Sequence, residues 1–291
     1  MIKTYAYTAL ALIAFAFNSI LCRLALRGDE ADAAGFTAVR LASGAAALII
    51  ISYFAGSRSK QQKRGSWPSA FFLFAYAICF SFAYLGLTAG TGALILFGSV
   101  QITMIGTAII RGERPRLLEW LGFLAATGGL VYLVFPGLSS PPIVSSVLMA
   151  AAGASWGFYT LRGKGSTDPL ANTTGNFVRS LPMIAVVVVI SLASIHLSTR
   201  GLILAVLSGA IASGIGYTVW YAALKHHTAT RAAILQLPVP LLTAVFGVLL
   251  LGEAATVRLG IAAALILGGI GLTLVKASNR GIAARKRCNL N

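Results

Sequence analysis

Residues 111–130 read RGERPRLLEWLGFLAATGGL, and residues 251–270 read LGEAATVRLGIAAALILGGI. Each stretch places a Gly-Glu pair ahead of an apolar run that ends in Gly-Gly, and the two lie 140 residues apart. Three further pairs of matching segments have nearly the same offset: 14–19 with 152–157, 38–40 with 177–179, and 93–95 with 233–235. One match alone is weak, but a near-constant offset across four of them indicates an internal repeat.

The composition places this chain outside the class of soluble proteins. Of its 291 residues, 57% are hydrophobic and 10% are charged, and the mean hydropathy is +0.84. A soluble domain has about 45–50% apolar and about 25% charged residues. A soluble enzyme, a DNA-binding protein and a disordered tail are therefore disfavoured, and a membrane protein remains. At about 20 residues a span plus short loops, the length accommodates about ten transmembrane helices.

Ten apolar runs are separated by short segments that carry Gly, Pro or charges. We predict helices over residues 4–26, 33–55, 68–88, 92–110, 117–135, 143–161, 171–195, 201–222, 230–251 and 256–276. The first run has no convincing small-residue cleavage site, so we interpret it as an uncleaved span and not as a signal peptide. The cysteines, Cys22, Cys79 and Cys288, lack the spacing of a disulfide framework or a zinc site.

Lysine and arginine residues are distributed unequally between the two ends of these helices. With the N-terminus inside, 17 of the 23 lie on the cytoplasmic side, three lie on the opposite side, and three lie within spans, at Arg23, Arg40 and Arg179. This positive-inside bias predicts a bacterial-type inner-membrane protein with both termini in the cytoplasm. It also accounts for the net charge of +16 without a nucleic-acid partner.

The repeat unit contains five helices, an odd number, so its two copies must cross the membrane in opposite orientations. We therefore expect an all-α polytopic membrane protein in which ten transmembrane helices form two inverted five-helix repeats around a central cavity. The first repeat comprises residues 1–138, and the second comprises residues 139–291 with a basic cytoplasmic tail. Inverted repeats are typical of secondary transporters, because the two halves exchange inward- and outward-facing forms around a midplane site.

The helix arrangement and the Gly-Glu segments together resemble a known family. With a short fourth helix running into Arg-Gly-Glu-Arg-Pro (111–115) and a ninth running into Leu-Gly-Glu (251–253), the chain resembles the EamA branch of the drug/metabolite transporter superfamily over essentially its whole length. Within that branch it is most similar to the YddG-type exporters of aromatic amino acids. The resemblance implies a basket of helices around a central cavity, alternating access and efflux of small metabolites.

Two arginines inside spans, Arg40 and Arg179, are repeat partners placed symmetrically about the predicted midplane. Charged groups in the bilayer are costly, which makes both of them candidate functional residues. One hypothesis is that the pair attracts the carboxylate of an amphoteric substrate. The other is that each guanidinium ties down backbone carbonyls or helix ends. The sequence leaves both open.

Further polar and aromatic side chains inside spans are candidates for the substrate cavity: Asn18, Tyr84, Gln101, Trp156, Tyr159, Tyr217 and Gln236. Of these, Tyr84, Gln101, Trp156 and Gln236 are predicted to share one central space. A packing role is the alternative, because polar side chains in apolar helices also form hydrogen bonds between helices.

Other residues of the second half have expected roles outside the binding site. Pro238 and Pro240 in the ninth predicted helix are candidate hinges, since proline interrupts backbone hydrogen bonding inside the membrane. Trp220 and Tyr221 close the eighth predicted helix and are expected to anchor it at the membrane interface.

Several kinds of chemistry find little support in the sequence. The seven acidic residues all lie at loops or helix ends, so no carboxylate within a span serves as a proton or sodium relay. Proton coupling, facilitated diffusion and exchange therefore stay open. We find no motif for a metal or a cofactor. Residues 153–157 match G-x-S-x-G around Ser155, but that motif needs a strand–turn–helix and here lies within a helical span.

The sequence thus predicts a transporter and not an enzyme, with a small molecule and the lipid bilayer as its partners and a monomer as the working assembly. Export of aromatic or other hydrophobic amino acids is the leading hypothesis. An exporter of drugs, purines or sugar derivatives with the same fold is one alternative. An intramembrane serine hydrolase that uses Ser155 is the alternative from another class.

Overall fold

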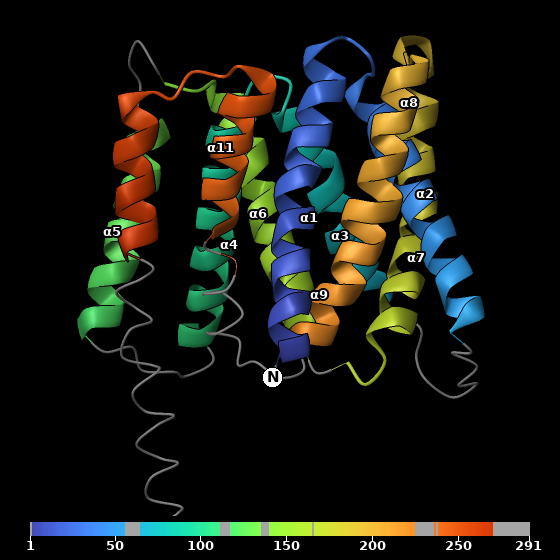
Figure 1. Ribbon diagram of the computed structural model, residues 1–291, viewed down its shortest axis with the longest axis horizontal. Coiled ribbons are helices and arrows are strands. Elements are labelled where there is room, and N and C mark those ends of the chain that lie inside the picture. Colours follow the sequence, from blue (N-terminus) through green and yellow to red (C-terminus); the bar gives the residue numbers. More distant parts are fainter. Residues whose placement is uncertain are drawn as a thin grey trace, which may run out of the picture.

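The computed structural model describes residues 2–55, 65–110, 117–134, 140–164, 166–224, 236 and 238–269. Within these ranges the regular structure is helical, apart from one isolated β-bridge between Ala31 and Leu197 (Figure 1). The helices of the first half are α1 (Ile2–Arg27), α2 (Ala33–Phe54), α3 (Trp67–Ala83), α4 (Ala89–Ile110) and α5 (Leu117–Val134).

One helix of the second half contains a π-helical segment in its middle. The elements of this half are α6 (Ile143–Gly163), α7 (Pro169–Ile190), the short turn η1 (Leu192–Ser194), α8 (Thr199–Val206), η2 (Leu207–Ile215), α9 (Gly216–Leu224), α11 (Pro238–Leu251) and a last helix, Val257–Gly269. The segments α8, η2 and α9 follow one another without a break, and η2 is π-helical. Such wide turns inside α-helices occur frequently at functional sites.

The predicted and observed helices agree closely except at three ends. The helix predicted over 68–88 stops at Ala83, because the chain turns there and Leu85 and Gly86 donate to the carbonyls of Phe82 and Ala83 at 3.3 and 3.2 Å. The helix predicted over 171–195 stops at Ile190, after which Asp32 N donates to the His196 carbonyl at 2.9 Å. The ninth helix is described from Pro238 onward.

Proline 238 is the first residue of α11. At this position a proline removes no hydrogen bond within the helix, since the first N–H groups of a helix have no partner in it. The candidate hinge residues Pro238 and Pro240 therefore both lie in the first turn of α11. The segment 225–235 that precedes them lies outside the described residues.

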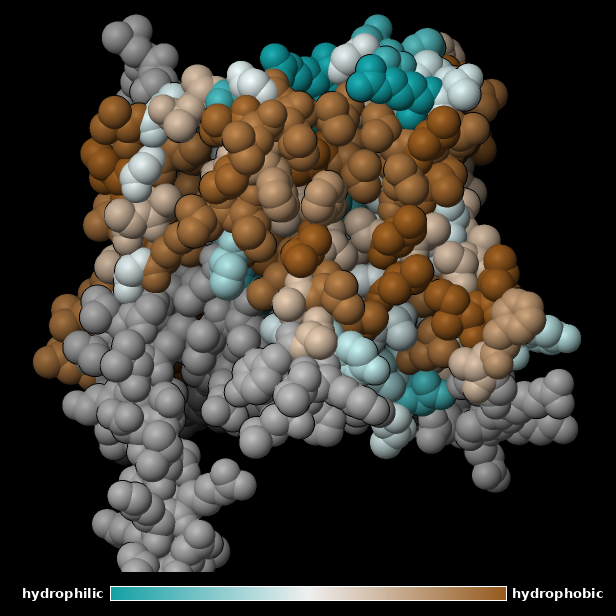
Figure 2. Space-filling model, viewed as in Figure 1, coloured by the Kyte–Doolittle hydropathy of each residue, from teal (hydrophilic) through white to brown (hydrophobic). Residues whose placement is uncertain are grey.

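The surface of the bundle suits a lipid environment. Within the described residues, six helices are long and apolar enough to cross a membrane, and four shorter helices are also apolar. Large hydrophobic side chains are exposed on the outside, among them Phe54, Ile110 and Ile190, which are 81%, 86% and 79% accessible. Figure 2 shows the hydrophobic colour covering the middle of one face and hydrophilic colour along its upper edge.

The helices pack so that α1 and α6 take central positions. Helix α1 contacts α9, η2 and α11, while α6 contacts α3 and α4. Helix α2 packs on α7 and on η2, and α4 packs on α11. In Figure 1, α5 and the last helix stand at one edge of the bundle, and α2, α7 and α8 stand at the other. The side chains between α1, α3, α4, α6 and α9 form the candidate site.

Candidate functional site

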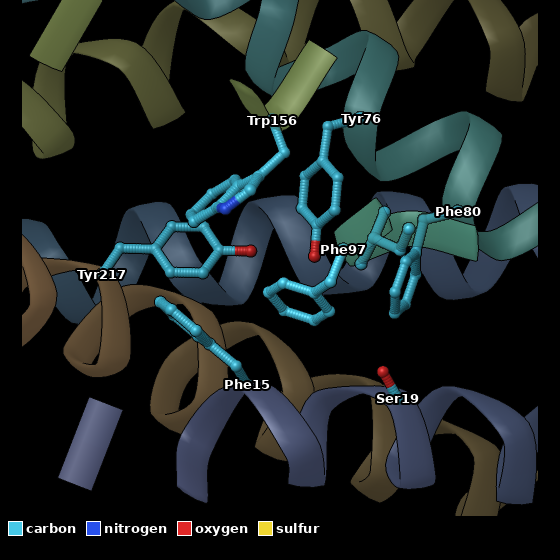
Figure 3. A pocket seen from close by; sticks show the side chains of 8 residues that line it. Phe15, Ser19, Tyr76, Phe80, Phe97, Trp156 and Tyr217 are labelled. Carbon is cyan, nitrogen blue, oxygen red and sulfur yellow. The ribbon is translucent and has the colours of Figure 1, made fainter. Parts of the chain in front are cut away.

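A narrow cavity lies in the middle of the bundle (Figure 3). It has a volume of about 260 Å³, including the part that is open to its surroundings. Its lining comes from α1, α3, α4, α6 and α9 and consists of Phe15, Ser19, Tyr76, Phe80, Leu96, Phe97, Trp156 and Tyr217. The space in it that a water-sized sphere can occupy is only about 10 Å³, so the cavity must widen to hold a metabolite.

The aromatic rings of the cavity form one connected set. Trp156 and Tyr217 have their ring centres 4.7 Å apart, and Trp156 and Tyr76 have theirs 5.1 Å apart. Phe15 stands edge-on to Trp156 at 5.6 Å. The orientation of the Trp156 ring is fixed by a hydrogen bond, in which its Nε1 donates to Oε1 of Gln236 at 3.2 Å. These contacts fix the rings and leave flat apolar faces toward the cavity.

Behind this aromatic wall lies Arg40 of α2, which is only 1% exposed. Its Nη2 donates to the hydroxyls of Tyr76 and Tyr217, both at 3.0 Å, and its Nε donates to Oγ of Ser213 at 3.1 Å. The guanidinium also lies 5.0 Å from the ring centre of Phe80. Its Nη1 is buried and has no hydrogen-bond partner among the described residues. A full positive charge is thus held by neutral groups.

The polar network continues from Tyr76 into α1 and η2. Asn18 Nδ2 donates to the Tyr76 hydroxyl at 3.2 Å, and Ser208 Oγ donates to Asn18 Oδ1 at 2.6 Å. All of these side chains are buried. Buried polar networks whose members have partners are rigid and specify one arrangement of helices. The network meets the cavity at Tyr76 and Tyr217, which belong to its lining.

The π-helical segment η2 brings two partners within reach of Arg40. A side chain at Gly209 of this segment would place its Cβ 2.1 Å from the carbonyl oxygen of Arg40, so the backbones of η2 and α2 approach as closely as glycine allows. Ser213 follows within η2, and Tyr217 follows in α9. The close approach therefore positions both hydroxyls against the guanidinium.

A second arginine, which is partly buried, lies at the end of the bundle where α1 ends. Arg23 Nε lies 3.2 Å from Oε1 of Glu253, and Arg23 Nη1 donates to the Tyr84 carbonyl at 2.9 Å. The other oxygen of Glu253 accepts from the backbone N–H of Ala89, the first residue of α4, at 2.7 Å. A carboxylate at a helix N-terminus is stabilised by the unpaired N–H groups there. Gly252, with φ of +61°, makes the turn that ends α11 and delivers Glu253.

The structure places the sequence-predicted site residues in three groups. Trp156 and Tyr217 line the cavity. Asn18 and Arg40 are hydrogen-bonded to Tyr76 of the lining, and Gln236 is hydrogen-bonded to Trp156. Tyr159 lies one layer further, 5.6 Å from Trp156 between ring centres, and its hydroxyl accepts from Asn176 at 3.4 Å. Their roles in transport stay predictions.

Other predicted site residues lie elsewhere. Gln101 is buried on α4 but is not part of the cavity lining. Tyr84, predicted to share the central space, lies just beyond the end of α3, where its hydroxyl donates to the Ala89 carbonyl at 3.3 Å. Tyr84 is not among the lining residues of this cavity, and its role in transport stays a prediction. Arg179 is half-buried on α7 and donates to the carbonyl of Gly175, one turn earlier, at 3.0 Å.

The predicted interface anchors of the eighth span are also corrected. Trp220 is fully buried and Tyr221 is 4% exposed, so neither lies on the outer surface of the bundle. Trp220 stands edge-on to Phe15 at 5.7 Å between ring centres. By contrast, Trp67 and Trp120 are 58% and 42% exposed, as an interface position requires.

Sequence reasoning missed most of the aromatic lining. Tyr76 is the centre of the network, and Phe15, Phe80 and Phe97 complete the wall. One signal was available, because Tyr76, Phe80 and Tyr84 follow each other at intervals of four and so share one face of a helix. Polarity alone drew the prediction toward amides and arginines, while the cavity is formed chiefly by rings.

The described residues lack the features of the catalytic alternative. Ser155 lies inside the continuous helix α6, and the strand that its motif requires is absent from the described ranges. Within the same ranges, no three His, Cys, Asp or Glu side chains are grouped so that they could hold a metal ion.

Comparison with known proteins agrees with these features. The model of the EamA-like transporter family matches residues 2–135 and again residues 144–275. An uncharacterized protein of Pseudomonas aeruginosa is 48% identical over 98% of both chains. An uncharacterized transporter of Bacillus subtilis is 29% identical over 88% of both chains, and one of Archaeoglobus fulgidus is 26% identical over 94% of this chain and 98% of its own. A crystal structure with 19% identity aligns with a TM-score of 0.66 over 94% of this chain and 97% of the other, which shows the fold alone.

Proposed function

Because the chain belongs to the EamA-like transporter family, we propose that it exports aromatic and other hydrophobic amino acids by alternating access. The chain is a multi-pass membrane protein of this transporter family. The substrate class and the direction of transport are the proposed part. The YddG-type specificity expected from the sequence belongs to the same proposal.

The observation that carries the proposal is the buried charge of Arg40 beside an aromatic cavity. Burying a charge is costly unless an opposite charge or strong hydrogen bonds compensate it. Neutral hydroxyls and ring faces surround Arg40, and no described carboxylate forms an ion pair with it. A substrate carboxylate supplies the missing negative charge, and the substrate's aromatic side chain packs on Phe15, Trp156 and Tyr217.

An exporter of drugs, purines or sugar derivatives is the alternative within the fold. Sugars and purines need several polar groups arranged along a cavity wall, since each buried hydroxyl or ring nitrogen of the ligand requires a partner. Here the polar groups of the lining are Ser19, Tyr76, Tyr217 and the indole N–H of Trp156, and that N–H is bound to Gln236. The rest of the lining is apolar, which favours a ligand with one charged end and one flat apolar end.

The repeat and the orientation also remain part of the proposal. We place residues 1–138 and 139–291 as two inverted repeats, with both termini in the cytoplasm of an inner-membrane protein. Two separate matches to one family model support this division. The helix contacts support it as well. The first helix of each half packs on the third and fourth helices of the other half: α1 contacts the α8–α9 helix and α11, and α6 contacts α3 and α4.

Cysteine labelling tests the orientation. Single cysteines at Ser59 and Gly281 should be labelled from the cytoplasm and one at Ser139 from outside; all three lie outside the described residues. An external Gly281 contradicts the odd-numbered repeat and, with it, the alternating-access argument.

Transport in proteoliposomes tests the function. The full chain should move phenylalanine and leucine across the membrane faster than empty liposomes do, and it should move nucleosides and sugar phosphates no faster. The same panel run with and without a pH gradient reports proton coupling. Flux of nucleosides or sugar phosphates without amino-acid flux contradicts the proposed substrate class and favours the broader exporter.

A further inference from the structure

The charge balance at the cavity bears on which part of the substrate is recognised. Arg40 contributes one positive charge directly behind Tyr76 and Tyr217. None of the eight lining side chains is acidic. The nearly buried Glu253, whose side chain is 7% exposed, is already paired with Arg23 at 3.2 Å. The described surroundings of the cavity therefore present a cation, hydroxyl groups and aromatic faces, and no anion.

Two tyrosine hydroxyls of the cavity lining are hydrogen-bonded to Arg40. The Tyr76 oxygen accepts from Arg40 and Asn18, at 3.0 and 3.2 Å, which occupies both of its lone pairs. The Tyr217 oxygen likewise accepts from Arg40 Nη2, at 3.0 Å. Tyr217 keeps its own hydrogen for donation, and Figure 3 shows its hydroxyl pointing into the cavity.

A donor backed by a cation suits a carboxylate. Hydrogen bonds from polarised donors to an ionised oxygen are about twice as strong as those between neutral groups. Arg40 polarises the Tyr217 hydroxyl by donating a hydrogen bond to its oxygen. The positive charge of the guanidinium therefore lies next to the hydroxyl that donates to the substrate. A monocarboxylate bound at Tyr217 thus leaves the closed site electrically neutral.

The ammonium group of an amino acid has no comparable partner here. Its charge has the same sign as that of Arg40, and like charges repel strongly where water is excluded. Aromatic faces such as that of Trp156 attract a cation, but this attraction is weaker than that of a carboxylate. A bound zwitterion leaves one net positive charge enclosed, which is unfavourable in an apolar bundle.

We propose that the cavity recognises aromatic monocarboxylates without an α-amino group, such as arylalkanoates and aromatic 2-oxo acids, at least as well as the amino acids. Tyr217 donates to the substrate carboxylate, Arg40 is the positioning residue that supplies the charge behind it, and the rings of Phe15 and Trp156 hold the aromatic end. This inference rests on the proposed function, since it takes the same cavity as the transport site. It extends the substrate class beyond amino acids.

Binding to the full chain in detergent tests the inference with four matched probes. Phenylalanine carries both charged groups, 3-phenylpropionate and phenylpyruvate carry the carboxylate without the ammonium, and 2-phenylethylamine carries the ammonium alone. Titration calorimetry should give dissociation constants for the two amino-free acids equal to or lower than that for phenylalanine. The amine should bind at least about tenfold more weakly, which matches the loss of one hydrogen bond to a charged group.

Paired tyrosine variants test the assigned donor. Tyr217→Phe removes the hydroxyl and keeps the ring, so it should raise the dissociation constants of all three carboxylates about tenfold while that of the amine changes less than twofold. Tyr221→Phe is the matched control, because Tyr221 is also buried and lies outside the lining. It should leave all four constants within twofold. The unfolding temperature of each variant, measured in the same detergent, reports whether the fold is intact.

The probe series on the unaltered chain decides the proposal even if a variant unfolds. Binding of phenylalanine more than tenfold tighter than of both amino-free acids overturns it, and so does binding of the amine as tight as that of the acids. Flux of phenylalanine in proteoliposomes upholds the proposed function in either case. Absence of binding and flux for every probe contradicts both proposals together.

Discussion

Two arginines inside the helix bundle of this transporter, Arg23 and Arg40, have opposite surroundings. Arg23 lies at the end of α1 and is paired at 3.2 Å with Glu253, which also accepts from the first N–H of α4 at 2.7 Å. Arg40 lies at the centre of the bundle and is held at 3.0–3.1 Å by the hydroxyls of Tyr76, Tyr217 and Ser213. Arg40 is buried and Arg23 is partly buried, but only Arg23 has an acid beside it among the described residues.

The difference separates an arginine that holds helices together from one whose charge is available to a ligand. A cation that serves packing alone is most stable with a carboxylate close by, as Arg23 is. Neutral hydroxyls and ring faces compensate part of the cost of burying Arg40, and in the proposed function a substrate carboxylate compensates the rest. The comparison therefore predicts that substitutions at Arg40 weaken substrate binding, whereas substitutions in the Arg23–Glu253 pair lower the stability of the fold.

The largest effect is expected from Arg40→Gln. The change removes the central charge and the donors that orient two tyrosine hydroxyls, so the uptake of phenylalanine by proteoliposomes should fall about 100-fold, equivalent to about 3 kcal/mol for a hydrogen-bonded charge. Arg40→Lys keeps the charge but not the planar set of donors, and its loss should be intermediate. The amount of folded protein, measured by size-exclusion chromatography, should stay within twofold because an uncompensated buried charge has been removed.

The opposite result at Arg40 has a clear meaning. If Arg40→Gln lowers the folded yield severely, and the remaining protein binds 3-phenylpropionate as tightly as before, the guanidinium is a packing group like that of Arg23. The distinction between the two arginines then fails.

A smaller and different effect is expected from Glu253→Gln. This change leaves Arg23 without its acid and weakens the N-terminus of α4. Breaking a buried pair costs about 3–5 kcal/mol, and the partial exposure of Arg23 reduces the expected loss of stability to about 1–3 kcal/mol. Thermal unfolding in detergent measures it, and the dissociation constant for phenylpyruvate should change less than twofold. The double variant Arg23→Gln, Glu253→Gln should recover part of the lost stability, because no unpaired charge then remains.

A loss of substrate binding in Glu253→Gln comparable to that in Arg40→Gln would merge the two regions into one functional unit. Equal stability of the single and double variants would show that the pair contributes little, as many ion pairs do.

Hydrophobic patterning predicted the fold well because membrane helices must be long, apolar and separated by polar punctuation. It failed where tertiary contacts set a helix end, as at Ala83, since the turn into α4 depends on Glu253 far away in the sequence. The Gly-Glu segment at 252–253 was recognised as a repeat signal, but its physical role is visible only in space. Gly252 turns the chain, and Glu253 joins α4 to Arg23.

The site was only partly predictable for a related reason. In an apolar sequence, a polar residue stands out, and Arg40, Asn18 and Gln236 were found in this way. A tyrosine or phenylalanine among many does not stand out, so Tyr76 and Phe15 were missed although they form the cavity wall. The π-helical turn that brings Ser213 to Arg40 has no sequence signal beyond the small residues of η2.

A moderate effect is expected from Asn18→Ala. Asn18 donates to the Tyr76 hydroxyl at 3.2 Å and so helps to fix Tyr76 in the cavity lining. Without this bond Tyr76 is held less firmly, so binding of 3-phenylpropionate should weaken about threefold to tenfold, about 1 kcal/mol for one neutral hydrogen bond. Calorimetry measures the change, and Thr243→Ala on α11, a buried hydroxyl outside the cavity lining, serves as the control. Equal losses in both variants would indicate a general packing defect.

The smallest effect is expected from Arg179→Gln, although Arg179 matches Arg40 in the sequence at an offset of 139. Arg179 is half-buried and is not part of the cavity lining. It donates to the carbonyl of Gly175 in its own helix at 3.0 Å. Equilibrium binding of phenylpyruvate should therefore change less than twofold. Measuring flux beside binding makes the test sharper. If the two halves exchange roles when the transporter turns over, Arg179 takes the position of Arg40 in the opposite-facing form, and Arg179→Gln should then slow flux several-fold while equilibrium binding stays unchanged. Unchanged flux would mean that the central charge belongs to Arg40 in both forms, whereas a tenfold loss of binding would contradict the asymmetry itself.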